Sequence, residues 1–246
     1  MGSLMDLKET DILGADIADH WYYKSKVKAM MRIIGEEMPS KILDVGAGSG
    51  FFSRYLLSHS TAQEALCVDV SYEGDTDSCE AGKDLYFRRS IESVDADLVL
   101  LMDVLEHVDD DVELLKEYAK KVPRGSRFLI SVPAFQFLWS GHDDFLEHKR
   151  RYTLHQLKDV VTSAGLRVKS GSYYFGMVFP IATTLRLASR LRRNPGRFPK
   201  SQLVRHHPLV NIALETLCQA ELPFMKLNRF DLITDIVKEL YLRLIL

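Results

Sequence analysis

Cysteine is scarce in this 246-residue chain, and the few positions it occupies exclude several kinds of site. The three cysteines are Cys67, Cys79 and Cys218. Their spacing matches no metal-ligand pattern, and an odd number argues against a disulfide framework. We therefore expect no metal site and a reducing, cytoplasmic location.

An excess of charge and a long hydrophobic run are also missing. The chain has 34 acidic and 32 basic residues, and this near balance gives no reason to expect nucleic acid as a partner. No apolar run reaches the length of a membrane span, and the polar N-terminus does not have the form of a signal peptide. The length fits one α/β domain with an elaboration, or two small domains.

A glycine-rich stretch follows the first apolar segment, and the rest of the chain is organised around it. Residues 42–45 (ILDV) predict a short buried strand, and residues 51–58 (FFSRYLLS) have helical spacing without a breaker. The glycines between them let the backbone turn sharply and approach a ligand. A helix N-terminus at this turn presents free N–H groups. The unit predicts a nucleotide site; the alternative is a tight turn without a ligand.

The spacing of these glycines distinguishes between nucleotide ligands. A dinucleotide fingerprint needs a third glycine where Phe51 stands, and a P-loop needs a lysine after Gly50. The Asp-x-Gly-x-Gly-x-Gly pattern that begins at Asp44 resembles motif I of the class I S-adenosylmethionine (SAM)-dependent methyltransferases. This resemblance implies SAM as the cofactor, S-adenosylhomocysteine as its product, and cofactor contacts from Asp44, Gly46, Ala47, Gly48 and Gly50.

An acidic residue ends the second predicted strand, residues 65–70 (ALCVDV). Asp69 follows the glycines at the distance that a βαβ unit requires, and a carboxylate there can accept both hydroxyls of a ribose. We expect Asp69 and its neighbour Val70 to contact the cofactor. Residues 71–84 are polar and rich in turn formers, so we expect a loop rather than a full crossover helix.

The position expected to face adenine departs from the family pattern. After the predicted strand over 85–88, class I methyltransferases often have an acid, whereas this chain has Ser90 and Ile91. The resemblance then implies that main-chain groups and an apolar contact hold the adenine.

An uninterrupted apolar run over 97–102 predicts a central parallel strand. The phrase Asp-Val-Leu-Glu-His at 103–107 follows it and resembles motif IV of the small-molecule methyltransferases. There the strand end faces the methionine part of SAM and the substrate, which implies cofactor contacts from Met102, Asp103 and Val104. Asp109 or Asp110 can cap a helix over 112–121, and residues 127–132 predict the next strand.

The loop over 134–152 is the most chemically loaded segment after the glycines. It follows the carboxyl end of a central strand, where open α/β sheets bind ligands, so it is a candidate substrate site. The alternative is a solvated loop in which its arginines pair with its own acids. Its phrases resemble bacterial methyltransferases of the 11/12/23 type, often associated with glycan or isoprenoid assembly. Candidate acceptor contacts in it are Trp139, Asp143, Arg150, Arg151 and Tyr152.

Three histidines are candidate general bases, because histidine has a pKa suited to proton transfer near neutrality. They are His107, His142 and His148, and His142 is favoured because its loop should face the substrate. Arg150 and Arg151 can hold an anionic acceptor. Near the N-terminus, Tyr22 and Tyr23 are candidate acceptor contacts, and the aromatics around Trp21 either cover the cofactor or pack a helix on the sheet.

The sequence pattern changes after a predicted helix over 154–164 and a predicted strand over 166–175. Residues 181–193 have an apolar face and an arginine face, and a basic, proline-broken linker over 192–208 follows. The last segment, from Asp231, has a helical apolar stripe, and no seventh strand is evident. This region can lie on an anionic membrane surface, cap the active site, or pack in the core or in a homodimer.

The sequence thus predicts a doubly wound, mostly parallel α/β fold with a C-terminal helical extension. We expect a mobile segment over 1–19, the SAM-binding domain over 20–176 and the helical extension over 177–246. The predicted function is methyl transfer from SAM to a small-molecule or glycan- or lipid-linked acceptor. The alternative is a module of this fold that binds SAM or a nucleotide without catalysis. A nicotinamide-dependent enzyme is disfavoured by Phe51.

Overall fold

The computed structural model describes residues 14–191, 206–223 and 239–245. Its helices and strands follow one another in chain order as η1 (Gly14–Asp19), α2 (Trp21–Ile34), β1 (Lys41–Val45), α3 (Phe51–His59), β2 (Glu64–Val68), β3 (Thr76–Glu80), β4 (Lys83–Arg88), β5 (Leu98–Met102), η2 (Leu105–His107), α4 (Asp111–Lys121), β6 (Arg127–Pro133), η3 (Gln136–Leu138), α5 (Gly141–Phe145), α6 (Leu154–Ser163), β7 (Arg167–Tyr174), α7 (Phe179–Leu191), α8 (Pro208–Glu221) and β8 (Glu239–Ile245).

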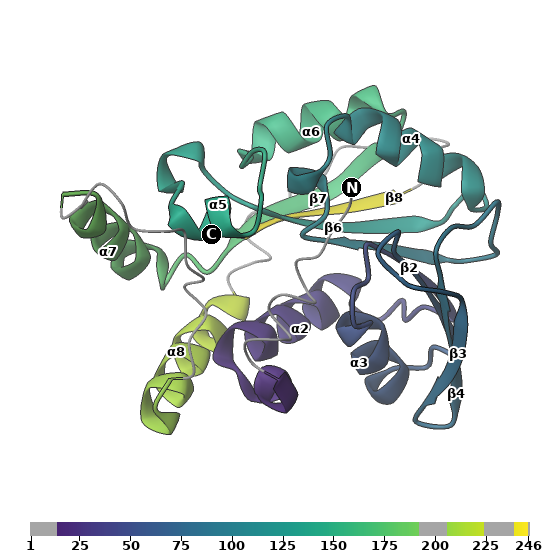
Figure 1. The fold of residues 1–246 in the computed structure, drawn as a ribbon, viewed down its shortest axis with the longest axis horizontal. Helices are drawn as coiled ribbons and strands as arrows, with labels where there is room; N and C mark the ends of the chain where they lie inside the picture. Colours follow the sequence, from purple (N-terminus) through teal and green to yellow (C-terminus); the bar gives the residue numbers. More distant parts are fainter. Residues whose placement is uncertain (1–13, 192–205, 224–238, 246) are drawn as a thin grey trace.

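Within the described residues, the strands form one eight-stranded sheet in the order β3-β4-β2-β1-β5-β6-β8-β7. Every neighbouring pair in it is parallel except β3 with β4. Helices α4 and α6 cover one face, and α2, α3 and α8 cover the other (Figure 1). The predicted doubly wound, mostly parallel α/β fold is therefore confirmed.

The two faces follow from the alternation of apolar side chains along the central strands. In β1, Leu43 packs with α4 and α6, whereas the preceding Ile42 packs with α2 and α3. All five residues of β5 are buried, as expected for a strand that is covered on both faces. The apolar run recognised in the sequence is thus the middle of the molecule.

The direction of the chain changes between β1 and β5, which lie side by side at the centre of the sheet. From β1 the chain proceeds to β2 on one side, and later returns to β5 on the other. Open α/β sheets bind ligands at such a switch point, outside the carboxyl ends of the strands. The glycine turn after β1 and the phrase after β5 both lie at this edge.

The polar segment over 71–84 is partly a strand, so the expectation of a loop was wrong for β3. β3 and β4 form a two-residue hairpin in which Ala81 and Gly82 both have positive φ, 52° and 76°. Such a turn matches the twist of the flanking strands. Because β3 is an exposed edge strand, it lacks the apolar alternation that would have revealed it. No crossover helix occurs in this segment, as expected.

Helix α2 packs in the core rather than forming a detached cover. Its apolar stripe, which includes Val27 and Met30, lies against the sheet. The Trp21 ring contacts Phe175 edge-on, with ring centroids 5.8 Å apart. Helix α8 packs on α2, where the Lys28 ammonium lies 2.7 Å from a Glu215 carboxylate oxygen. Of the two alternatives for the N-terminal aromatics, packing on the sheet is the one that the structure has.

The C-terminal segment corrects the sequence interpretation most strongly. Residues 239–245 form strand β8, not the end of a helix, and β8 lies between β6 and β7, parallel to both. A further strand therefore exists, although none was evident from the sequence. The start of the predicted helix, Asp231 to 238, lies outside the described residues, as does the linker over 192–205.

The other terminal predictions have mixed outcomes. Residues 1–13 of the predicted mobile segment lie outside the described residues, while residues 14–19 form η1. The predicted helices after residue 177 occur as α7 and α8. No helix in the described part of the chain is both long and apolar enough to cross a membrane.

Candidate functional site

The glycine stretch forms the sharp turn between β1 and α3 that the sequence predicted. Gly46, Gly48 and Gly50 all have positive φ, 65°, 52° and 74°, a conformation that glycine adopts without strain. A Cβ at Gly46 would lie only 2.8 Å from the Cγ2 atom of Val104. The turn after β1 therefore touches the segment after β5, and a larger residue at Gly46 would push them apart.

Two carboxylates hold this turn in place. Asp44 is buried at the end of β1 and accepts a hydrogen bond from the Ser53 hydroxyl of α3 at 2.8 Å. Asp69, at the end of β2, accepts from the Gly48 N–H at 3.2 Å and from the Ser71 hydroxyl at 2.6 Å. Asp69 is thus directed at the glycine turn, as expected for the acid that receives a ribose.

The residues predicted to surround adenine follow β4, the strand that pairs with β2. Ser90 follows β4, whose last residue, Arg88, accepts a backbone hydrogen bond from Asp69. Ser90 is exposed, Val70 is 57% exposed, and Ile91 is half-buried. Ser90 and Ile91 line a cavity of about 410 Å³ on the face of β2 and β4, and no residue of the glycine turn lines it.

The carboxylate that follows β5 is held by a buried lysine that we did not predict from the sequence to belong to the site. Asp103 forms an ion pair with Lys26 of α2 and accepts a hydrogen bond from the Ser131 hydroxyl at 3.0 Å. The Lys26 ammonium also lies over the rings of Tyr22 and Phe52, 5.3 and 5.2 Å from their centroids. Lys26 is 1% exposed. The sequence position of Lys26 could have predicted its burial, because Lys26 lies four residues before Met30 and shares the buried stripe of α2.

The predicted acceptor contacts Tyr22 and Tyr23 belong to the same aromatic packing. Tyr22 stacks on Phe175, with ring centroids 5.4 Å apart, and Tyr23 contacts Phe51 edge-on. Tyr23 is 3% exposed. The structure therefore places Tyr23 in the core beside the glycine turn and leaves the half-buried Tyr22 next to Lys26.

The short helix η2 after β5 brings two histidines and a buried acid together. Glu106, His107 and His148 offer ligand-type atoms that all lie within 4.8 Å of one another. The His107 and His148 rings meet edge-on, with centroids 4.8 Å apart. Burial, and then the neighbouring Asp103 carboxylate, raise the pKa of Glu106 well above its ordinary value. We did not predict a role for Glu106 from the sequence, although it belongs to the Asp-Val-Leu-Glu-His phrase at 103–107.

The loop over 134–152 holds His148 in a fixed orientation. The Asp143 carboxylate lies 2.9 Å from His148 Nδ1 and accepts from Arg151 Nε at 2.6 Å. Although burial alone would raise it, these two partners hold the pKa of Asp143 well below its usual range. Asp143 also accepts from the Ser140 N–H, so α5 begins with a capping box.

Other polar residues of this loop are engaged within the protein rather than directed at an acceptor. Arg150 donates to the carbonyls of Val108 and Asp109, and Arg151 donates to the Ala134 carbonyl at 3.0 Å. The Tyr152 hydroxyl, which is buried, lies 2.7 Å from an Asp111 carboxylate oxygen.

Arg151 thus pairs with Asp143 of its own loop, whereas Arg150 pairs with Asp111 of α4. The alternative of a solvated loop is met only in part, because Asp143, Arg151 and Tyr152 are buried, and acceptor binding by these residues stays a prediction. These side chains fasten the loop to η2 and to the start of α4.

His142 and Trp139 belong to the same loop, and His142 lies close enough to Asp143 and His148 for both to act on its pKa. Burial lowers the pKa of His142 to about 4, so its imidazole is neutral and weakly basic near pH 7. The Trp139 indole N–H donates to Asp144 at 2.8 Å. The assignment of His142 as the general base stays a prediction, and its lowered pKa argues against it.

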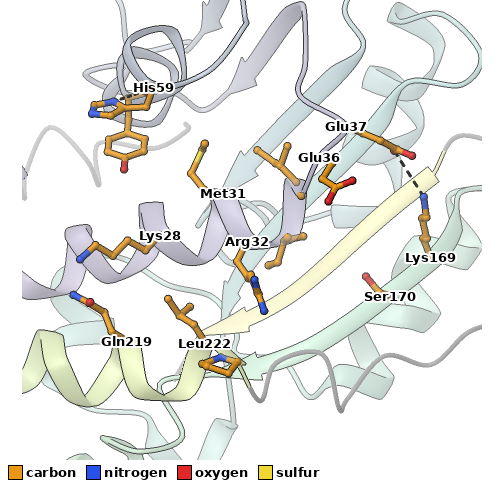
Figure 2. Close-up of a pocket in the computed structure, with 15 residues that line it drawn as sticks. Lys28, Met31, Arg32, Glu36, Glu37, His59, Lys169, Ser170, Gln219 and Leu222 are labelled. Atoms are coloured by element: carbon orange, nitrogen blue, oxygen red, sulfur yellow. Dashed lines mark hydrogen bonds and ion pairs between the residues drawn. The ribbon is translucent and has the colours of Figure 1, made fainter.

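A large cavity, of about 1150 Å³, lies elsewhere in the molecule. Figure 2 shows its walls, with Lys28 and Arg32 from α2, Gln219 and Leu222 near the end of α8, and Lys169 from the beginning of β7. Lys169 lies near the start of β7, and the lining residues Glu36 and Glu37 come shortly before the start of β1. The cavity therefore lies at the amino ends of these strands. The cavity is therefore on the opposite side from the glycine turn.

Comparisons with known proteins identify the family of this chain. Residues 19–170, more than half of the chain, match a family model of type 23 that is described as a methyltransferase domain. No curated protein matches the sequence.

Among solved structures, a complex from Haloferax volcanii pairs the Trm112 methyltransferase activator with a protein described as a methyltransferase. The match has 17% identity and a TM-score of 0.50, and covers 66% of this chain and 74% of that one.

A SAM-dependent methyltransferase from Thermotoga maritima has 18% identity and a TM-score of 0.45, with 59% and 71% of the two chains covered. CalO1, a calicheamicin-biosynthesis methyltransferase bound to S-adenosylhomocysteine, has 20% identity and a TM-score of 0.42, with 60% and 50% covered. At such identities the matches concern the fold alone.

Proposed function

This chain belongs to the methyltransferase-domain family, and from that premise we propose that it transfers a methyl group from SAM to a small-molecule or a glycan- or lipid-linked acceptor. One observation carries the proposal. The glycine turn and Asp69 lie at the same edge of the sheet as Asp103 and the His107–His148 pair, and Gly46 touches Val104 across the switch point. A cofactor end and an acceptor end are thus adjacent.

The residues at the cofactor end fit SAM. The positive-φ glycines let the turn pack closely against its neighbours, since a Cβ at Gly46 would meet Val104 and one at Gly50 would meet Phe87. The Asp69 carboxylate already accepts hydrogen bonds at the turn and can accept from ribose hydroxyls. When bound, SAM supplies a methyl group that its positively charged sulfur activates. The chain supplies alignment, which can lower the barrier by several kcal/mol.

At the acceptor end, we assign activation of the acceptor to the pair His107 and His148. His148 is oriented through Nδ1 by Asp143, so its Nε2 is presented to Glu106 and His107. His142 is a weaker candidate because burial lowers its pKa to about 4. Lys26 acts as a positioning residue, since its ammonium compensates the charge of Asp103.

The cytoplasmic location proposed from the sequence is supported by the thiols. None of the three cysteines forms a disulfide, and Cys79 is exposed. A reducing compartment keeps such thiols reduced.

A non-catalytic module that binds SAM is the second candidate. It is favoured by the burial of the acceptor end, where Glu106 is fully buried and His107 is 7% exposed. An acceptor would have to reach this pair through a movement of the loop over 134–152.

Release of S-adenosylhomocysteine separates the two candidates. The purified chain is incubated with SAM and a panel of hydroxylated, amino and polyprenyl-phosphate acceptors. We expect at least one acceptor to accelerate the release, and we expect His148→Ala to remove that acceleration. The matched control is His155→Ala, because the His155 side chain is 87% exposed and lies outside the site. SAM binding with no acceptor-dependent release across the panel would favour the non-catalytic module.

A further inference from the structure

The cluster of Glu106, His107 and His148 has the composition of a metal site. Two imidazoles and one carboxylate come from two separate segments, η2 and the loop after β6, and their ligand-type atoms all lie within 4.8 Å of one another. Two elements are needed to bring them together, so sequence spacing alone does not display the cluster.

Two members of the cluster have buried polar atoms without partners. Neither carboxylate oxygen of Glu106 has a hydrogen bond among the described residues, and neither does His148 Nε2. Glu106 is 0% exposed. Burying a carboxyl group without a partner is costly, and coordination of a metal ion is one of the ways in which proteins satisfy such a group.

The groups behind the cluster are arranged as they are around metal-binding histidines. A ligating histidine typically gives its other ring nitrogen to a carboxylate, which fixes the ring orientation. His148 does this through Nδ1 to Asp143, at 2.9 Å, and Asp143 is itself held by Arg151 and Ser140. The nitrogen that remains, Nε2, is the one that belongs to the cluster.

We propose that Glu106, His107 and His148 bind a divalent first-row transition metal ion such as Zn²⁺. Imidazole nitrogen suits these ions, whereas Mg²⁺ and Ca²⁺ prefer sites made of oxygen alone. Three protein ligands leave a fourth position open, as in catalytic zinc sites. Zinc–ligand bonds of about 2.1 Å place tetrahedral ligands about 3.4 Å apart, so the side chains close in by about an ångström on binding.

Because of the position of the cluster, an ion bound there can act on the acceptor. Glu106 and His107 come two and three residues after Val104, at the edge that carries the glycine turn. An ion there lowers the pKa of a hydroxyl that binds it. This role rests on the proposed function, whereas binding of the ion does not depend on it.

Calorimetric titration with Zn²⁺ tests the site. The protein is first treated with a chelator, and Mg²⁺ serves as the comparison ion. We expect stoichiometric binding of Zn²⁺, no comparable binding of Mg²⁺, and at least tenfold weaker Zn²⁺ binding by Glu106→Gln and His148→Ala. His155→Ala removes an exposed histidine outside the cluster and should bind as the wild type does. The absorption of bound Co²⁺ gives a second readout, because its spectrum reports nitrogen and oxygen ligands.

Two results would overturn the proposal: no Zn²⁺ binding by the wild type, or equal affinity in Glu106→Gln. Glu106→Gln keeps the shape of the side chain, and near-ultraviolet circular dichroism verifies that each variant is folded. Titration of SAM into the same samples separates this inference from the proposed function. A chain that binds SAM but not Zn²⁺ loses the metal site alone, and a chain that binds Zn²⁺ but not SAM loses the methyltransferase proposal alone.

Discussion

At the scale of single residues, the contact between Gly46 and Val104 links the two halves of the site. Gly46 belongs to the turn after β1, and Val104 to the segment after β5. A Cβ on Gly46 would lie 2.8 Å from Val104 Cγ2, and the positive φ of Gly46, 65°, adds strain for any other residue. Glycine at this position is therefore required by both backbone conformation and space.

Substitution of Gly46 should separate these two requirements. We expect Gly46→Ala to lower the free energy of unfolding by about 2–4 kcal/mol and to weaken SAM binding, since strain and overpacking add. Gly82 also has a positive φ, 76°, but a Cβ there would meet no atom within 4 Å, so Gly82→Ala should lose only about 1–2 kcal/mol. Gly74→Ala, with neither feature, should be nearly neutral.

Urea unfolding and SAM calorimetry measure these variants. The double variant Gly46→Ala with Val104→Ala should recover part of the SAM affinity, because it removes the side chain that the new Cβ meets. Equal losses for Gly46→Ala and Gly82→Ala would show that the contact with Val104 is unimportant.

At the scale of elements, the sequence predicted what strong local patterns determine. The strand, glycine turn and helix over 42–58, the buried β5, and the helix capped by Thr153 all occur. β8 was misread because a short apolar run fits a helix and a buried strand equally well, and only its place between β6 and β7 decides. Likewise, Arg150 and Arg151 were recognisable as charged loop residues, but their partners depend on how the loop folds onto η2.

Helix α7 exposes apolar side chains that a partner could cover. Ile181 and Leu185 are 48% and 66% exposed on one of its faces. The sequence from 186 to 207 contains arginines and a lysine but no acid, so the region is strongly basic. Exposed apolar side chains beside a basic segment fit an anionic membrane surface, where a lipid-linked acceptor would be found.

Sedimentation with anionic vesicles tests this surface. We expect binding at low salt that weakens at high salt, because exposed charges are screened. Leu185→Asp should reduce the binding about 100-fold, as it loses apolar burial and adds repulsion, whereas Thr184→Asp adds the charge alone and should cost about fivefold. No binding at low salt would end this proposal. A dimer that Leu185→Asp dissociates would instead make a second copy of the chain the partner.

At the scale of the whole molecule, the site is an assembly at one edge of the sheet. β1, β2, β5 and β6 deliver the glycine turn, Asp69, Asp103 and the loop over 134–152 to their carboxyl ends. The cofactor end could be predicted because its spacing is local. The acceptor end could not, because Lys26, Glu106 and His148 meet only after α2, η2 and the loop pack together.

Calorimetric titration of the wild-type chain with SAM, S-adenosylhomocysteine and NAD tests the central claim most directly. The turn at Gly46 to Gly50 lacks the third glycine of a dinucleotide site, and Asp69 is directed at the turn. We therefore predict that SAM and S-adenosylhomocysteine bind and that NAD does not. Binding of NAD without binding of SAM would contradict the account.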